Sequence, residues 1–192
     1  DAADVSVLKD ATVDNGGTIA GGAGDDTITG SSGADSIDGG DDADTFRITD
    51  GFGNDTITGG EGGTDEDVLD LSGLSGPVTV TYTGDEEGTI TDGTDTISFA
   101  EVEELVLTDG ADVVDATADS VGVNIIAGAG SDSIVGGDGN DTFQGGSGDD
   151  TISGGLGDDV IDDEAGAGSG QGNDIFDGGA GNDSIYAGTG GE

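Results

Sequence analysis

The chain has 192 residues, with 44 Asp and Glu against 2 Lys and Arg, and a formal net charge of -42. So few basic residues exclude nucleic-acid binding, which requires Lys and Arg against phosphates, and an anionic membrane surface would repel the chain. Cys and His are both absent, which excludes disulfides and metal sites built on thiolate or imidazole.

Residues 1–18 carry no clear repeat, and we expect them to form an N-terminal cap or linker. A first repeat block follows over residues 19–70, in which one apolar residue returns at a nearly constant spacing of nine. These positions are Ile19, Ile28, Ile37 and Phe46, followed after slightly longer steps by Ile57 and Leu69. The phrase GGAGDDTIT, from Gly21, is typical of this block. A short fixed period predicts stacked units that together bury one narrow core.

Residues 71–107 lose the glycine phrase. The stretches VTVTY from Val78 and TISF from Thr96 alternate apolar and polar residues, which predicts half-buried strands. Turns are expected around Gly84 and at Asp92-Gly93, and AEVEELVL, from Ala100, should lead into a further strand. The sequence therefore predicts an insertion of ordinary strands between two repeat blocks.

The second repeat block covers residues 108–192 and begins with a degraded repeat that keeps Asp112 and Val114 in register. Its phrases include GGDGNDTFQ from Gly136, GGSGDDTIS from Gly145, GGLGDDVID from Gly154 and GGAGNDSIY from Gly178. The block stops inside a repeat, and Asp1 is not a natural first residue. We therefore expect the chain to be part of a larger parent protein.

Each phrase has the form GGxGxD followed by a spacer, an apolar residue and a spacer. Its glycines predict a tight turn, because a Cβ forbids several of the backbone conformations needed there. Such a turn supplies inward carbonyl oxygens, to which the Asp adds a carboxylate. Ca²⁺ takes roughly six to eight hard oxygen ligands in tolerant geometry, whereas Mg²⁺ demands a stricter octahedron. The phrase therefore favours calcium as the cofactor, with several ions bound.

These phrases resemble the RTX (repeats-in-toxin) calcium-binding nonapeptide repeats, over about two thirds of the chain. The resemblance implies an all-β fold, a right-handed parallel β-roll in which two repeats make one coil and an ion lies between stacked turns. Our fold prediction is two such blocks with an intervening segment of ordinary strands. Stacking each repeat on the next but one gives roughly seven ions if every pair is filled.

The resemblance also implies the ligands. The carboxylates are Asp26, Asp35, Asp44, Asp55 and Asp67 in the first block, and Asp132, Asp141, Asp150, Asp159, Asp174 and Asp183 in the second. The backbone carbonyls are those of Gly137, Gly139, Gly146, Gly148, Gly155 and Gly157. Some first-block phrases depart from the pattern: GSSGADSID lacks a glycine and Asp42 stands where a glycine is expected. The second block matches more closely.

The remaining acids are expected at the surface as solubilising groups; they are Asp41, Glu61, Asp85, Glu86, Glu87, Glu103, Glu104, Asp163 and Glu164. Catalysis is not expected. With Lys9 and Arg47 as the only basic side chains, no Ser has a recognisable activating partner. Paired carboxylates such as Asp25-Asp26 recur as repeat elements, unlike a glycosidase dyad placed across a cleft.

Two functions remain open. By the resemblance, the chain is a segment of a bacterial protein exported by type I secretion, unfolded at low calcium and folded outside the cell, with calcium ions as its partners. Activity would then belong to the remaining domains of the parent. Alternatively, the open ends of a roll allow self-association into a filament, adhesin stalk or surface layer, stabilised by calcium. Neither function involves nucleic acid or a membrane span, and both place the chain at the cell surface or outside the cell.

Overall fold

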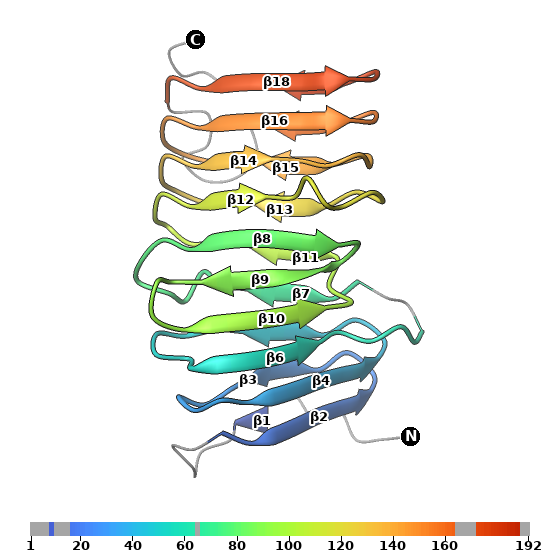
Figure 1. Cartoon of the computed structure of the whole chain (residues 1–192), viewed down its shortest axis with the longest axis vertical. Coiled ribbons are helices and arrows are strands. Elements are labelled where there is room, and N and C mark those ends of the chain that lie inside the picture. The colour runs from blue at the N-terminus through green and yellow to red at the C-terminus, as the bar shows by residue number, and fades with distance from the viewer. Residues whose placement is uncertain (1–7, 10–15, 64–65, 164–171, 189–192) are drawn as a thin grey trace.

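The computed structural model describes residues 8–9, 16–63, 66–163 and 172–188, which form two stacked β-sheets (Figure 1). These residues contain no helix, and therefore no apolar helix of the length needed to cross a bilayer. The chain passes back and forth between the sheets, rising from its N-terminal end at the bottom of Figure 1 to its C-terminal end at the top.

Within the described residues, sheet A has nine strands. Their spatial order is β1 (Leu8–Lys9), β3 (Thr27–Thr29), β5 (Thr45–Arg47), β7 (Val68–Asp70), β11 (Glu104–Val106), β13 (Asn124–Ile126), β15 (Thr142–Gln144), β17 (Val160–Asp162) and β19 (Ser184–Tyr186). All neighbours in this sheet are parallel.

Sheet B has ten strands in the same described part of the chain. Their order is β2 (Thr18–Ala23), β4 (Ser36–Asp41), β6 (Asn54–Thr58), β10 (Thr96–Ala100), β9 (Glu87–Thr91), β8 (Thr79–Gly84), β12 (Val113–Asp115), β14 (Ser133–Val135), β16 (Thr151–Leu156) and β18 (Ile175–Ala180). With one strand in each sheet per coil, the stack makes about eight turns. The predicted all-β parallel roll is confirmed.

The periodic apolar residues face each other between the two sheets. Within a sheet they stack in register, as Phe46 does on Leu69 in sheet A and Ile134 on Ile152 in sheet B. Each is at most 1% exposed, except Ile19, Ile37, Phe176 and Ile185. Because each short strand contributes a single large side chain, a coil becomes stable only when its neighbours cover it.

The central segment, residues 71–107, joins this stack in a different way. Of its predicted strands, β8, β10 and β11 are present, and β9, which was not predicted individually, lies between β8 and β10. Strand β9 is antiparallel to both neighbours, whereas β10 is parallel to β6 and β8 to β12. In sheet A, β7 pairs directly with β11. Sheet B therefore has two additional strands at this level.

Candidate metal centres along the edges of the stack

The predicted aspartates lie in the turns, at or next to the start of a strand. We call edge A the row of turns that lead into sheet A and edge B the row that lead into sheet B. Edge A holds Asp26, Asp44, Asp67, Asp141, Asp159 and Asp183, and edge B holds Asp35, Asp55, Asp132, Asp150 and Asp174. All except Asp174 and Asp183, in the last coil, are at most 4% exposed.

Glycine is favoured at the second and fourth positions of most of these turns for two reasons. In the turn 154–159, Gly155 and Gly157 have φ values of +115° and +124°, which a side chain strongly disfavours. A Cβ on Gly155 or Gly157 would also collide with the carbonyl oxygen of the corresponding glycine one coil below. At the fourth position of its turn, Asp42 adopts the same left-handed conformation with φ of 76°.

Neighbouring aspartates on one edge are joined by hydrogen bonds. The backbone N–H of each donates to Oδ1 of the aspartate in the next coil, at 2.7–3.1 Å. The bonds link Asp26 to Asp44, Asp44 to Asp67, Asp35 to Asp55, Asp132 to Asp150, Asp150 to Asp174, Asp141 to Asp159, and Asp159 to Asp183. We call each such row an aspartate ladder. All of the predicted carboxylates are thus brought together in stacked pairs.

The second carboxylate oxygen has a different environment. In Asp44, Asp132, Asp150 and Asp159, Oδ2 is buried and accepts no hydrogen bond. In Asp26, Asp44 and Asp159, Oδ2 lies beside the first glycine of its own turn, and the carbonyl oxygen of the first glycine one coil above borders the same space. A Cβ built on Gly21, for example, would lie 2.8 Å from Asp26 Oδ2 and 2.5 Å from the Gly39 carbonyl oxygen.

Burial raises the pKa of these carboxyl groups. The pKa rises to about 7 for Asp132 and to about 6 for Asp44, Asp55, Asp141 and Asp150. Desolvation is the largest cause, and the negative charge of neighbouring aspartates adds to it, while the N–H donor from the adjacent coil lowers the pKa. A buried, incompletely bonded carboxylate needs either a proton or a cation.

The protein has almost no cations of its own to offer. Arg47 forms an ion pair with Asp70, its Nε lying 3.9 Å from a carboxylate oxygen, on the partly exposed surface. In the described part of the chain, no three or more His, Cys, Asp or Glu side chains converge on one point. A bound ion would therefore be held by a carboxylate pair together with backbone carbonyls. Such an all-oxygen donor set fits Ca²⁺.

The predicted carbonyl ligands lie along the same edges. The carbonyls of Gly137, Gly139, Gly155 and Gly157 border the matching glycines one coil above, and that of Gly148 borders Gly172. The Gly137 carbonyl also accepts the Leu156 N–H at 2.9 Å. Gly146 packs against the carbonyl of Gly128.

Sequence reasoning missed three residues here. Asp112 continues the edge B ladder below Asp132, to whose Oδ1 it donates its N–H at 2.7 Å, and its register position was the available signal. Glu103, expected at the surface, accepts the N–H of Asp67. Asp163, also expected at the surface, is 1% exposed and accepts the Gly146 N–H, because it takes the place of a glycine at the end of β17.

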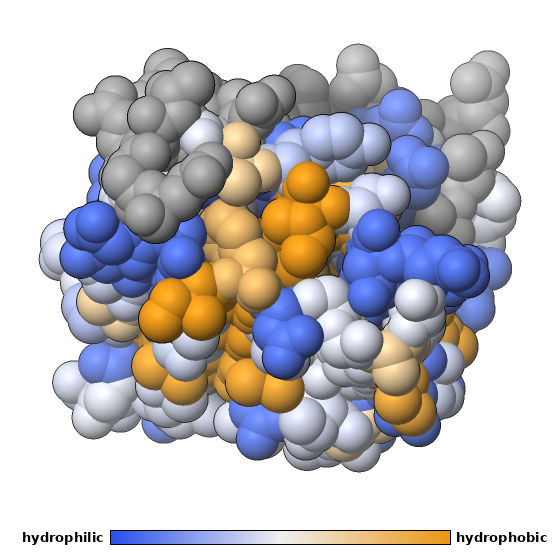
Figure 2. Space-filling model, turned by 90° about the horizontal axis from the view of Figure 1, so that it is seen from above, coloured by the Kyte–Doolittle hydropathy of each residue, from blue (hydrophilic) through white to orange (hydrophobic). Residues whose placement is uncertain are grey.

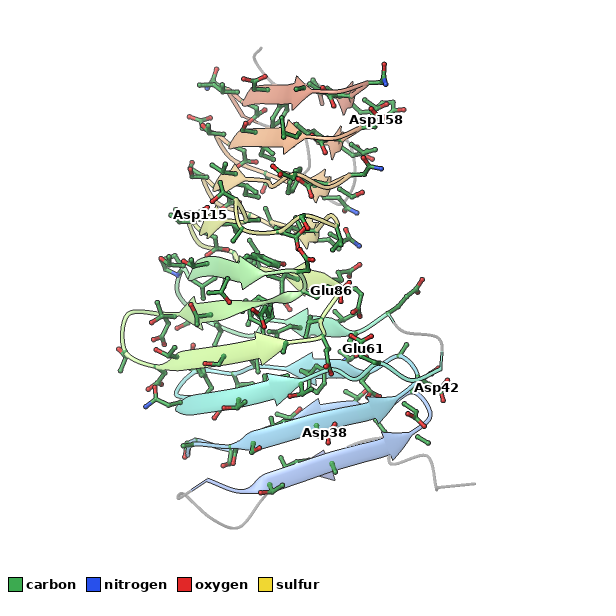
Figure 3. The ribbon with its side chains drawn as sticks, turned by 45° about the vertical axis from the view of Figure 1, so that its right-hand side comes forward. Asp38, Asp42, Glu61, Glu86, Asp115 and Asp158 are labelled. Atoms are coloured by element: carbon green, nitrogen blue, oxygen red, sulfur yellow. The ribbon has the colours of Figure 1, made fainter. Side chains whose placement is uncertain are left out.

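Other acidic side chains stand outside the ladders. Figure 3 shows Asp42, Glu61 and Asp158 at the turns of edge A, where they project from the stack, and Asp38 and Asp115 on strands of sheet B. Glu164 lies outside the described residues. Asp38, Glu61, Asp115 and Asp158 are exposed to solvent, which distinguishes them from the buried ladder aspartates.

Comparison with known proteins gives one family. A family model described as the RTX calcium-binding nonapeptide repeat matches the chain in four copies, at residues 14–46, 47–63, 125–162 and 169–191. Together these stretches make up more than half of the chain. They contain every predicted carboxylate except Asp67, and they leave out the central segment. A search of curated proteins found no match.

Proposed function

Because the chain belongs to the family of RTX calcium-binding nonapeptide-repeat proteins, we propose that it binds several Ca²⁺ ions along both edges and that these ions hold its coils together. The observation that carries the proposal is the buried, unbonded Oδ2 of Asp44, Asp132, Asp150 and Asp159. Four such oxygens in a chain with only two basic side chains, of which Arg47 pairs with Asp70 at the surface, call for a cation from solution.

The stacked pairs of the eleven aspartates would supply the carboxylate ligands, and the turn glycines the carbonyl ligands. The eleven aspartates form seven pairs, because Asp44, Asp150 and Asp159 each belong to two, so one divalent ion per pair is enough to neutralise their charge. Without ions, like charges repeated along each edge oppose the compact state. Ion binding is then largely folding free energy, as in other small metal-dependent domains.

The proposed biological role follows from this coupling. The chain would remain largely unfolded at the low calcium level of the cytosol, pass through a type I secretion system, and fold at the cell surface or outside the cell. Its role would be structural rather than catalytic, and other domains of a parent protein would carry the activity.

The experiment is a calcium titration of the full chain, followed by calorimetry and far-UV circular dichroism. Asp150 is shared by two ladder pairs, so Asp150→Asn should lower the number of bound ions and raise the calcium concentration at the folding midpoint. Asp138→Asn is the matched control, since Asp138 is an exposed side chain in the neighbouring phrase. No calcium uptake, or equal behaviour of the two variants, would overturn the proposal.

A second candidate, self-association, rests on the C-terminal end of the stack. Strands β18 and β19 each have a neighbour on one side only among the described residues. Ile175, Ile185 and Tyr186 there are 65%, 43% and 53% exposed, and Figure 2 shows apolar side chains gathered at this end between polar ones. Sedimentation velocity in millimolar calcium tests it: growing particles support end-to-end association, and a single monomeric species refutes it.

A further inference from the structure

The turns of this protein fall into two classes. In the open turns, the second and fourth residues have positive φ; these turns are 21–26, 39–44, 50–55, 127–132, 145–150, 154–159 and 178–183. Four of them, 39–44, 127–132, 145–150 and 154–159, contain an aspartate whose buried Oδ2 is unbonded. In the closed turns, 30–35, 107–112 and 136–141, the second and fourth residues do not have positive φ. There the N–H of the second residue donates to Oδ2 of the aspartate.

Two closed turns add a hydroxyl to this bond. Ser31 donates its N–H to Asp35 Oδ2 at 2.7 Å and its hydroxyl at 2.9 Å. Thr108 donates its N–H to Asp112 Oδ2 at 2.9 Å, and its hydroxyl lies 2.9 and 3.0 Å from the two carboxylate oxygens. In both, a Ser or Thr replaces the second glycine of the phrase. The protein itself thus supplies the donors that the open turns lack.

Closed turns share one position in the stack: each holds the first aspartate of a ladder. The coil below has Gly17, Val78 or Val123 at the aspartate position, and its N–H donates to Oδ1 of Asp35, Asp112 or Asp141. These aspartates have a carboxylate partner only in the coil above, so no carboxylate pair exists for a cation to bridge to the coil below. Hydrogen bonds to the charged oxygens stabilise them instead.

The central segment lies between ladders and has no aspartate pair on either edge. On edge A, the chain passes from Asp67 through Glu103 to Val123, and on edge B the ladder resumes only at Asp112. Its core is also richer in large apolar groups. The buried residues are Leu71, Leu74, Val78, Val80, Tyr82, Ile90, Ile97, Phe99, Val102, Leu105 and Leu107, and the Tyr82 and Phe99 rings meet edge to face at 5.4 Å.

We infer that residues 71–112, the central segment with the closed turn that follows it, fold without calcium, and that the calcium-dependent coils assemble on this unit in both directions. The inference rests on the proposed function for the calcium dependence of the blocks. Antiparallel pairing of β8, β9 and β10 through short turns makes the unit local in sequence, so its formation does not require closure of long loops.

The test is hydrogen exchange of the full chain, resolved by mass spectrometry on peptides, in EGTA and in calcium. In EGTA, amides of β8 to β10 should exchange at least ~10-fold more slowly than those of β14 to β17, which are expected to open freely. A chain of about 40 residues is near the lower limit for folding on its own core, so protection should be partial. Equal, unprotected exchange in both regions in EGTA overturns the inference.

Hydrogen exchange in calcium distinguishes a failure of the proposed calcium binding from a failure of the inferred independent folding of the central unit. If β14 to β17 gain no protection in calcium, the proposed function fails, whatever the central segment does. If they gain protection and β8 to β10 were already protected in EGTA, both proposals are supported. If the two regions become protected only together, at the same calcium concentration, the central unit is not independent and the inference is wrong.

Variants test whether the closed turn 107–112 stabilises the central unit in the absence of calcium. Thr108→Val removes the hydroxyl and keeps the shape, and in EGTA it should lower the protection of β8 to β10 about 10-fold, the effect of leaving one buried acceptor underbonded. Thr117→Val is the matched control, since its hydroxyl bonds Asp115 at 2.7 Å on the exposed surface. Thr108→Ser should restore protection. Equal effects of the two Val variants overturn the role of the turn.

Discussion

In the repeat blocks each strand delivers one large apolar side chain to the core, as β14 does with Ile134, whereas β8 delivers Val80 and Tyr82 and β10 delivers Ile97 and Phe99. The turns differ in the same sense. Four repeat turns bury an aspartate whose second carboxylate oxygen is unbonded, while the turn that ends the central segment, like the closed repeat turns 30–35 and 136–141, donates to its own aspartate. Sparse cores and unneutralised turns occur together, which explains why one region would need ions and the other not.

The largest expected effect is that of removing calcium. Chelation should abolish most of the β signal of the two blocks and leave a residual signal from the central strands, because only the blocks depend on bridged carboxylates. Far-UV circular dichroism before and after EGTA measures it. A spectrum unchanged by chelation, or one with no residual β signal, would contradict the proposed difference in calcium dependence between the repeat blocks and the central segment.

Acid should partly replace calcium. Five ladder carboxyl groups have a pKa of about 6 to 7 when folded, above the ordinary 3.8; they are Asp44, Asp55, Asp132, Asp141 and Asp150. The ion-free folded state therefore binds protons more tightly than the unfolded chain. This stabilisation is complete below about pH 3.8 and is lost as the pH rises through 6 to 7. In EGTA, lowering the pH from 8 to 5 should therefore increase the β signal. A decrease over that range contradicts the burial of these groups.

Core truncation should separate the regions further. In calcium, Ile90→Ala and Ile134→Ala should each lower the free energy of unfolding by ~2–5 kcal/mol, as cavities of this size do. In EGTA, Ile90→Ala should also remove the residual protection of the central strands, whereas Ile134→Ala should leave it unchanged. Denaturant unfolding and hydrogen exchange measure the two effects. Loss of central protection in Ile134→Ala would show that the blocks and the centre fold as one.

The smallest effect concerns backbone strain inside the central segment. Glu101 has φ of 57° in the turn from β10 to β11, a conformation that costs a side-chain-bearing residue ~1 kcal/mol. Glu101→Gly should recover part of this, while Glu101→Ala keeps the strain and serves as control. The gain should appear in EGTA as slower exchange of β9 and β10, which pair within the unit. Equal rates in the two variants would locate the strain elsewhere.

Much of this architecture could be read from the sequence. The period of nine predicted the stacked core, and counting from Ile19 or Ile125 placed each aspartate beside the partner it has in the structure. The direction of β9 could not be predicted, since alternation of apolar residues is the same in parallel and antiparallel strands. Two of the closed turns could have been predicted from Ser31 and Thr108, whose hydroxyl groups are able to donate to the aspartate. Gly137 donates only its N–H to Asp141, so a glycine also forms a closed turn when the coil below lacks an aspartate.

The two additional strands of sheet B have a consequence for the shape of the whole stack. At about 4.8 Å per strand they make sheet B roughly 10 Å longer than sheet A. The central segment is therefore wedge-shaped, with its wide side in sheet B. The coils that precede this segment must be tilted relative to those that follow it, and in Figure 1 β2 and β4 are inclined to β16 and β18. The two rows of ladders therefore do not continue one another in a straight line, and a larger assembly carrying this chain would change direction at residues 71–107.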